Sequence, residues 1–159
     1  MEFQTADLYD EHGKNLQVAT PMFQSYGSKN AFAGKIVTVK CHEDNSVVKA
    51  ELGNDGTGKV LVVDGGGSLR RALVGDQLAA KGIKNGWQGI IVNGCIRDSK
   101  LINAMNIGIR AINTNPAKTE KLGVGQLNIV INFANVTFTP GHFVYADEDG
   151  IVVSEEKLV

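Results

Sequence analysis

Two short loops contain the side chains of this sequence that could do chemistry. Asp76 follows Gly75 at the expected start of a helix, and Arg97 and Asp98 stand between a buried strand and the next helix. The first turn of a helix has unpaired backbone N–H groups and the positive end of the helix dipole, so it can bind a carboxylate. Taken alone, each loop has a plain structural explanation, because Asp is favourable at a helix start and an adjacent Arg and Asp often form a solvated ion pair.

The two loops become informative when they are considered together. Both follow strand-like runs and open helices, and in open α/β sheets binding sites collect beyond the carboxyl ends of the strands. We therefore expect them to converge on one crevice, where Arg97 holds a substrate carboxylate with two hydrogen bonds. Asp98 would bind a hard divalent cation and Asp76 one of its water molecules, because Mg²⁺ usually keeps several waters and few protein ligands. The pattern indicates a site for a small oxo-acid anion that chelates a metal.

A third motif, three consecutive glycines at 65–67, follows the apolar run that ends in Asp64. A glycine-rich turn after a buried strand can cradle a phosphate or lead into a nucleotide site. Here the glycines are adjacent rather than spaced as GxGxxG, the following SLRRALV resembles a strand more than a helix, and GK[ST] is absent. The sequence therefore favours a tight reversal that lets Asp64 and the backbone approach a neighbouring loop, rather than a dinucleotide or methyl-donor site.

The composition restricts the class of protein. The 159 residues include 16 Lys and Arg against 17 Asp and Glu, which gives a formal net charge of −1. A general nucleic-acid binder needs clustered cations to neutralise phosphates, so direct binding to nucleic acid is not expected. The acidic N-terminus lacks the apolar core of a signal peptide, and no apolar run approaches the roughly 18–20 residues of a membrane helix. We expect a soluble, cytoplasmic protein without a membrane segment, folded as one domain over residues 1–159.

Cysteine and histidine offer no further site in the sequence. Cys41 and Cys95 are far apart and form no CxxC pair, so we expect buried, reduced thiols. His12, His42 and His142 lack the spacing of metal ligands.

The elements that must position the two loops follow from the apolar patterning. Apolar and β-branched runs predict strands at 34–40, 58–64, 69–74, 87–92 and 107–113, the fourth of which should end before Asn93. Helical spacing predicts helices at 5–13, 46–52, 77–84 and 99–105, with Thr5 and Ser46 as caps. Further strands are expected within 127–138 and at 142–146 and 151–153. This order predicts the α/β class, with one layered domain and a mixed sheet.

The spacing between the two loops carries a family resemblance. Asp76 is followed by twenty residues and then by Arg97 and Asp98, which is the Asp, twenty residues, Arg-Asp motif of the RraA-like proteins. Further similar segments are AGKIVTVK at 33–40, VLVVDGGGS at 60–68, GDQLAA at 75–80, VNGCIRD at 92–98 and YADEDGIVV at 145–153. Over essentially its whole length the chain resembles this family, which includes 4-hydroxy-4-methyl-2-oxoglutarate aldolases and regulators of ribonuclease activity A.

The resemblance implies a layered β/β/α fold of the swivelling-domain type and a class II, divalent-metal-dependent aldolase. Such an enzyme cleaves 4-hydroxy-4-methyl-2-oxoglutarate-type 2-oxo acids to pyruvate, and oxaloacetate decarboxylation passes through the same enolate. Asp98 would be the ligand of Mg²⁺ or Mn²⁺, and Asp76 would act with Arg97 in catalysis by holding a water on the metal. The residues that would bind the substrate are Gly75, Asp76, Gln77, Leu78 and Arg97. The family also implies a homotrimer, or a hexamer of two trimers.

The main alternative is a non-catalytic regulator that binds and inhibits an RNA-degrading endonuclease of the ribonuclease E type. The length of the chain resembles that branch, but Asp98 favours catalysis, because a regulator has no physical need for a metal-binding carboxylate there. A quinone methyltransferase would need a methyl-donor pocket, which the glycine turn does not supply. Neither loop contains a lysine for a Schiff base, although Lys81 and Lys100 lie close enough in sequence to leave that chemistry open.

Overall fold

The computed structural model describes residues 2–159. Its helices are α1 (Thr5–His12), α2 (Ser46–Leu52), α3 (Asp76–Lys84) and α4 (Ser99–Ile102), with a short 3₁₀ helix at Gly13–Asn15. Its strands are β1 (Leu16–Val18), β2 (Gln24–Tyr26), β3 (Phe32–Lys40), β4 (Lys59–Asp64), β5 (Ala72–Val74), β6 (Gly89–Ile96), β7 (Gly108–Thr114), β8 (Gln126–Leu127), β9 (Ile131–Phe133), β10 (Val136–Phe138), β11 (Phe143–Asp147) and β12 (Gly150–Ser154). None of the helices in this part of the chain is long and apolar enough to cross a membrane.

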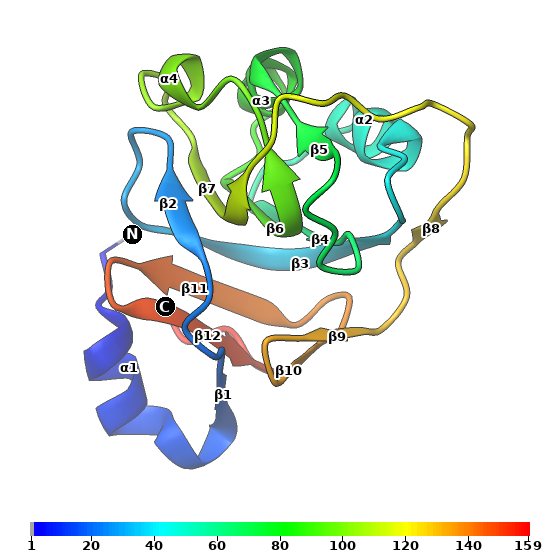
Figure 1. The fold of residues 1–159 in the computed structure, drawn as a ribbon. Helices are drawn as coiled ribbons and strands as arrows, with labels where there is room; N and C mark the ends of the chain where they lie inside the picture. The colour runs from blue at the N-terminus through cyan, green and yellow to red at the C-terminus, as the bar shows by residue number, and fades with distance from the viewer. Residues whose placement is uncertain (1) are drawn as a thin grey trace.

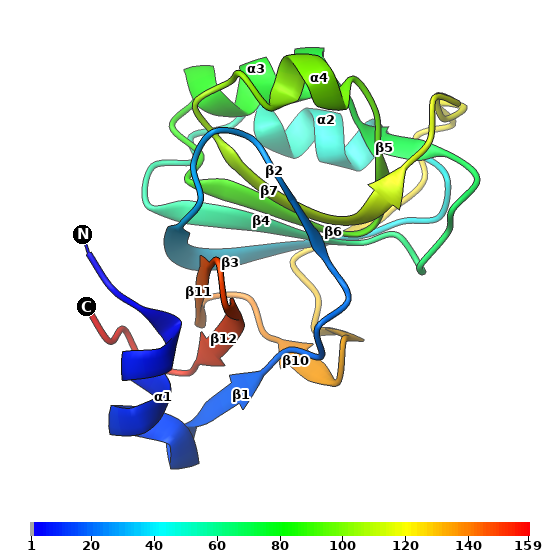
Figure 2. The same ribbon diagram turned by 60° about the vertical axis from the view of Figure 1, so that its left-hand side comes forward.

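The strands form one large mixed sheet and a separate hairpin. The main path of the sheet runs β1-β12-β11-β3-β4-β6-β7-β2, with β5 paired to β6 and β8 to β3, while β9 and β10 pair only with each other. The central strands β3, β4, β6 and β7 are parallel. Helices α2, α3 and α4 cover one face of these strands, and β11, β12 and the hairpin lie under the other face (Figures 1 and 2). The predicted α/β class, with a layered arrangement and a mixed sheet, is confirmed.

Side chains of β4 alternate between two hydrophobic cores, as the pleat of a strand requires. Leu61 and Val63 belong to the core beneath the helices, and Val60 and Val62 belong to the core between the two β layers. The first core also contains Leu52, Ala79 and Ile102 from the helices, and the second contains Phe138, Val144 and Val153 from the lower strands. Burial on both faces explains why this strand is an uninterrupted apolar run in the sequence.

Strand β6 continues to Ile96, which corrects the prediction that it ends before Asn93. Asn93 is buried, and its Nδ2 donates a 3.0 Å hydrogen bond to Oδ1 of Asp64 on the neighbouring strand. At Gly94 an added Cβ would lie 3.3 Å from Cδ1 of Leu73 on β5, so this side chain would have to shift by a few tenths of an ångström to accept it. The polar and small residues that resemble a turn in the sequence therefore lie inside the sheet. As a result, Arg97 follows directly on the end of a long central strand.

Other boundaries differ by a few residues. Strand β5 starts at Ala72 rather than at 69, helix α4 ends at Ile102 rather than at 105, and β1 and β2 occupy segments for which no strand was predicted. The 127–138 segment divides into β8 and the β9–β10 hairpin. The two turn residues of this hairpin, Ala134 and Asn135, have φ angles of 52° and 60°. A turn of this kind usually contains glycine, and because neither residue here is glycine the hairpin was not predicted.

Thr5 and Ser46, which were expected to cap α1 and α2, form other hydrogen bonds. Gln4 and Asn45 occupy the cap positions of α1 and α2, and neither makes a side-chain cap bond. Thr5 instead donates through Oγ1 to Oδ1 of Asp147 at 2.6 Å, which ties α1 to the end of β11. Ser46 donates through Oγ to Oδ1 of Asp44, also at 2.6 Å.

Candidate functional site

The loops that follow β5 and β6 meet at one edge of the sheet. These strands are parallel neighbours, with Ala72 paired to Cys95 and Val74 to Ile96, so their carboxyl ends lie side by side. The N–H of Arg97 donates a 2.9 Å hydrogen bond to the carbonyl of Val74. Helix α3 begins after the first strand and α4 after the second, as Figure 1 shows. The structure thus brings together the two loops in which the candidate residues lie.

Asp98 links the two loops through its carboxylate. It lies just before α4 in the left-handed conformation (φ 58°, ψ 35°), which Asp tolerates better than most residues. Its Oδ2 accepts a 3.1 Å hydrogen bond from the N–H of Asp76 and lies 3.9 Å from Nε of Arg97. The hydrogen bond from the backbone N–H of Asp76, together with the charge of Arg97, lowers the pKa of Asp98 against the effect of burial. This carboxyl group is therefore ionised at neutral pH.

Gly75 allows the two loops to approach this closely. A Cβ added at this position would lie 2.8 Å from Oδ2 of Asp98 and 3.4 Å from Cγ and Nε of Arg97. Contacts under 3.0 Å essentially never occur for a real Cβ, so any larger residue would displace the carboxylate. Glycine is needed here for the space it leaves, since its φ of −119° is open to any residue.

The start of α3 presents free backbone N–H groups at the same place. The first backbone hydrogen bond of this helix runs from the N–H of Ala79 to the carbonyl of Gly75, at 3.0 Å. The N–H of Asp76 is used by Asp98, whereas those of Gln77 and Leu78 precede the first helical hydrogen bond. These two N–H groups and the helix dipole can bind an anion.

A cavity of about 160 Å³ lies over this junction. It is lined by Asn45, Lys49, Ala72, Gly75, Asp76, Gln77, Leu78, Arg97, Asp98, Lys118 and Lys121. Every residue that the sequence predicted for substrate or metal binding is therefore on the wall of one cavity. Its size suits a small anion rather than a nucleotide cofactor, since pockets for drug-sized ligands are usually about 300–1,000 Å³.

Three lysines that line this cavity were not predicted from the sequence. Lys49 comes from α2, and Lys118 and Lys121 come from the extended segment between β7 and β8, which passes near α2 in Figure 1. Lys81 and Lys100, the lysines considered for a Schiff base, are not among the lining residues. A polar loop far along the chain carried no local signal that would have placed its lysines here.

Buried hydrogen bonds hold the lysine-bearing segment in place. The Oγ1 of Thr119 donates to Oδ1 of Asn45 at 2.8 Å, and both residues are buried. The Oδ2 of Asp44 accepts from the N–H groups of Leu122 at 2.9 Å and Val124 at 3.1 Å. Burial of Asp44 opposes its ionisation, but the hydrogen bonds from Ser46, Val124 and Leu122 outweigh it and lower its pKa to about 2. The segment is thus anchored on both sides of Lys121.

The glycine turn forms the tight reversal that the sequence favoured. The N–H groups of Gly65 and Gly67 donate to the carbonyl of Asn93 at 3.0 and 3.1 Å, and the N–H of Gly66 donates to Oδ1 of Asp64 at 2.9 Å. All three backbone donors are therefore used within the protein. They are not available to cradle a phosphate or a methyl donor.

The remaining reactive side chains lie elsewhere. Cys41 and Cys95 are buried free thiols, as expected. Burial, with the nearby Asp44 and Asp64, raises the pKa of Cys41 to about 12, and burial also raises the pKa of Cys95. Neither thiol is a nucleophile at neutral pH.

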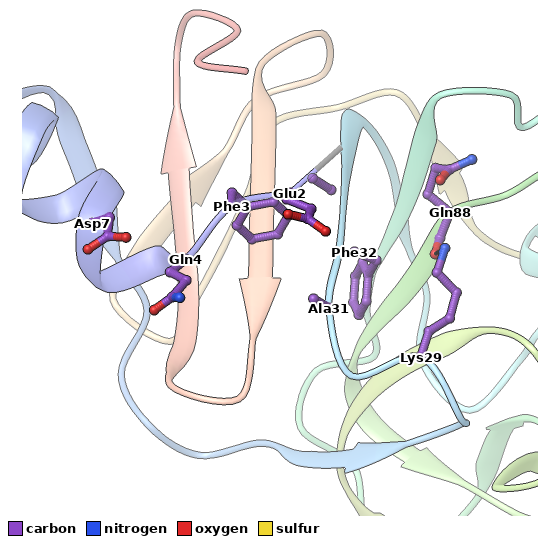
Figure 3. A pocket seen from close by; sticks show the side chains of 9 residues that line it. Glu2, Phe3, Gln4, Asp7, Lys29, Ala31, Phe32 and Gln88 are labelled. Carbon is purple, nitrogen blue, oxygen red and sulfur yellow. Dashed lines mark hydrogen bonds between the residues drawn. The ribbon is translucent and has the colours of Figure 1, made fainter.

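A larger, more open hollow of about 620 Å³ lies away from this junction (Figure 3). The segment before α1 and the start of β3 form it, with Phe3 and Phe32 among its lining residues and Glu2, Asp7 and Lys29 as its charged groups. It contains none of the residues that the sequence predicted for the site.

Comparison with known proteins agrees with the two-loop motif. Residues 5–153 match the family model described as RraA-like, Aldolase/RraA. The chain belongs to the RraA-like family. A curated relative from Aromatoleum aromaticum is 58% identical, with 100% of both chains covered, and carries the provisional name 4-hydroxy-4-methyl-2-oxoglutarate aldolase.

Two solved structures of this family have nearly the same fold. One from Geobacillus kaustophilus, described as an S-adenosylmethionine:2-dimethylmenaquinone methyltransferase, is 49% identical with a TM-score of 0.96, covering 98% of this chain and 97% of its own. The other, from a Thermus species, is described as the RNA-processing inhibitor RraA and is 38% identical with a TM-score of 0.96, covering 100% of this chain and 96% of its own. Proteins similar to this chain thus carry three different functional names on one fold, so the function of this chain has to be argued from its site.

Proposed function

We propose that this protein is a divalent-metal-dependent aldolase that cleaves 4-hydroxy-4-methyl-2-oxoglutarate-type 2-oxo acids to pyruvate and decarboxylates oxaloacetate as a side activity. One observation carries the proposal, namely that Arg97, Asp76 and Asp98 line a single small cavity with the first turn of α3. The name of the Aromatoleum aromaticum relative supports it. The methyltransferase description has no such support here, because the glycine turn uses all its N–H groups internally.

The 2-oxo-acid end of the substrate would bind where positive groups converge. Arg97 would donate to the substrate carboxylate through its guanidinium group. The free N–H groups of Gln77 and Leu78 would donate to the same end of the molecule, beside Gly75 on the wall of the cavity. These contacts orient the substrate so that its 2-oxo group lies next to Asp98.

The residues of the cavity fit a divalent cation that keeps most of its ligands for water and substrate. In the part of the chain that the structure describes, no group of three or more His, Cys, Asp and Glu side chains could hold a metal. Asp98, ionised and already oriented by Asp76, suits the one-carboxylate binding that is typical of Mg²⁺ and available to Mn²⁺. A bound cation would polarise the 2-oxo group and stabilise the negative charge of the enolate.

In the proposed reaction the C3–C4 bond of the substrate breaks. Its electron pair passes to C3, which becomes the enolate carbon of pyruvate, while the C4 hydroxyl loses its proton and C4 becomes a carbonyl carbon. Asp76 would hold the water molecule that takes this proton, and a proton then returns to C3. With 4-hydroxy-4-methyl-2-oxoglutarate both products are pyruvate. Oxaloacetate reaches the same enolate by losing CO₂.

Pyruvate release from both substrates tests the proposal, with Mg²⁺, with Mn²⁺ and with EDTA. We expect turnover that requires the metal and that Asp98→Asn and Arg97→Gln each reduce by at least about 100-fold, the usual effect of removing one electrostatic contact to a transition state. Matched controls are Asp10→Asn and Arg70→Gln, which make the same changes at exposed positions outside the cavity. A blank with metal alone is required, because free cations decarboxylate oxaloacetate. If wild type, variants and blank give equal rates, the protein is not this enzyme.

The alternative function is inhibition of an RNA-processing endonuclease by protein–protein contact, and the description of the Thermus relative is the observation that favours it. Such binding would not need a divalent cation and would survive Asp98→Asn. A pull-down with a ribonuclease E-type enzyme, in EDTA and with this variant, distinguishes the two functions.

We infer that the chain also assembles into a homotrimer, or a hexamer of two trimers. Exposed large apolar side chains on and after the lysine-bearing segment support this, because several of them close together in the sequence make this segment a candidate for a subunit contact. The side chains concerned are Leu122, Val124, Leu127 and Val130. Light scattering coupled to gel filtration gives the mass directly, and a monomer would contradict the inference.

A further inference from the structure

We propose that Lys49, Lys118 and Lys121 form a subsite for the second carboxylate of the substrate, the one farthest from its 2-oxo group. The inference rests on the proposed function and adds to it the choice of substrate. It assigns to these three lysines the recognition of the carboxylate that distinguishes a 2-oxo diacid from a 2-oxo monoacid of the same length.

The charge of the cavity is the first argument. Four cationic side chains, the three lysines and Arg97, line the same small space as the carboxylates of Asp76 and Asp98. This local excess of positive charge stands out in a chain whose net charge is −1. One carboxylate of a 2-oxo acid can be bound by Arg97 and the start of α3, and Asp76 and Asp98 would face the cation. Among the residues that the structure describes, none of the three lysines forms an ion pair. A substrate with a second carboxylate supplies a counter-charge for them.

The second argument is that the lysines come from two separate parts of the chain. Lys49 lies on α2, whereas Lys118 and Lys121 lie about seventy residues further along, in the segment that follows β7. The segment reaches the cavity because its backbone pairs with the edge of β5, where the N–H of Ala72 donates a 2.7 Å hydrogen bond to the carbonyl of Ala117. The carbonyl of Lys118 also accepts from Nη1 of Arg71, at 3.2 Å.

The third argument is that these backbones are fixed in advance. Thr119, between the two lysines of the segment, is buried and bonded to Asn45, which directly precedes α2. Asn45 in turn donates through Nδ2 to the carbonyl of Leu73 at 3.0 Å, one residue before Val74 at the end of β5. The same asparagine therefore joins the lysine-bearing segment, α2 and the strand that leads to Gly75. Fixing the backbone reduces the conformational freedom that the subsite loses on binding a carboxylate.

Each exposed lysine should contribute modestly to the affinity for the second carboxylate, and two lysines together should contribute more. A charge pair at a solvated site typically changes binding by a small factor, because water and salt screen it. We therefore expect a several-fold effect from each lysine and about tenfold or more from a pair. High ionic strength should weaken diacid binding more than monoacid binding.

Two inert ligands measure the effect without turnover. 2-Oxoglutarate and 2-oxopentanoate have five carbons each and differ only in a carboxylate or a methyl group at C5, the position of the second carboxylate in 4-hydroxy-4-methyl-2-oxoglutarate. Calorimetry with Mg²⁺ present should give a Kd for 2-oxoglutarate at least tenfold lower than that for 2-oxopentanoate. The double variant Lys118→Met/Lys121→Met should reduce this ratio by about tenfold, and Lys49→Met should reduce it several-fold.

The matched control is Lys84→Met/Lys157→Met, which removes the same charge from exposed positions outside the cavity. This variant should keep the wild-type ratio. If the wild type binds both ligands and Lys118→Met/Lys121→Met leaves their ratio unchanged, the subsite is wrong while the proposed function stands. If the wild type binds neither ligand and releases no pyruvate, the proposed function fails and the subsite fails with it.

Discussion

The backbone N–H of Asp76 donates a 3.1 Å hydrogen bond to Oδ2 of Asp98, although the two are 22 positions apart in the sequence. This bond joins the first residue of α3 to the residue that precedes α4. It fixes the carboxylate proposed to bind the metal against the helix start proposed to bind the substrate. A change that disturbs one of these groups should therefore disturb the other.

Gly75→Ala is the smallest substitution that tests this arrangement. The new Cβ would lie 2.8 Å from Oδ2 of Asp98, so the carboxylate has to move away from the N–H of Asp76. A displacement of about 1 Å at a reacting centre can cost roughly 100-fold in rate. We expect kcat/KM for pyruvate release to fall between about 10- and 100-fold, together with a weaker affinity for Mg²⁺ in a metal titration.

Gly82→Ala is the matched control, because it makes the same change within the same helix. There the added Cβ would meet side-chain atoms of Ile107 and Leu52 at 3.5 Å, an ordinary contact. Replacing a glycine inside a helix should stabilise the fold by up to about 1 kcal/mol and leave kcat/KM unchanged. If kcat/KM falls equally in the two variants, the loss comes from any change within α3 and not from the contact between residue 75 and Asp98.

Asp44→Ala should release the lysine-bearing segment in a pH-dependent way. The carboxylate accepts hydrogen bonds from Ser46, Leu122 and Val124, whose loss should lower the free energy of unfolding by about 1–3 kcal/mol at neutral pH. Since the pKa of about 2 in the folded protein lies below the ordinary value of 3.8 for Asp, the stabilisation is complete above pH 4 and is lost as the pH falls toward 2.

Thermal unfolding at several pH values checks this prediction. The Tm difference between wild type and Asp44→Ala should be full at pH 6 and should shrink between about pH 4 and pH 2. The exposed Asp10→Ala, which removes a carboxyl group that takes no part in these hydrogen bonds, serves as the control. A Tm difference that stays constant over this range would mean that the ionised carboxylate is not what holds the segment.

Much of the central sheet could be predicted from the sequence, because its strands are buried on both faces. The stretch from Val60 to Val63 in β4 has to be apolar throughout, and such stretches are easy to recognise. Strands β1 and β2, with three residues each and mostly exposed, lack this signal. At Asn93 and Gly94 the error was the opposite one, because these residues resemble a turn in the sequence but lie inside β6. Their contacts with Asp64 and Leu73 are tertiary and could not be predicted from the sequence.

Only the part of the site that lies in loops between a strand and the following helix could be predicted from the sequence. The loops at Asp76 and Arg97 each follow a strand and open a helix, so the general behaviour of parallel sheets places them together. Lys118 and Lys121 reach the cavity through the buried bond between Thr119 and Asn45 and the pairing of Ala117 with β5. Contacts between residues more than forty positions apart leave no periodic pattern in a single sequence.

The two cysteines should be inert in the native protein. The pKa of Cys41 is about 12, so at pH 8 only about one thiol in ten thousand is ionised, and both thiols are buried. We expect iodoacetamide at pH 8 to leave both unmodified and pyruvate release unchanged, while both react in guanidinium chloride. Mass spectrometry counts the modified thiols, and loss of activity on alkylation would point to a thiol-dependent mechanism.

Thr119→Val tests whether Thr119 affects the choice between the two ligands as well as the stability of the fold. Valine has nearly the shape of threonine but lacks the hydroxyl, so Oδ1 of the buried Asn45 loses its donor, at a cost of about 1–3 kcal/mol in the free energy of unfolding. Because Thr119 anchors the segment between Lys118 and Lys121, the Kd ratio of 2-oxopentanoate to 2-oxoglutarate should also fall. Thr119→Ser restores the hydroxyl and should recover most of that ratio even if the lost methyl group lowers the Tm. A ratio that follows the Tm instead of the hydroxyl would show that Thr119 acts only on the stability of the fold.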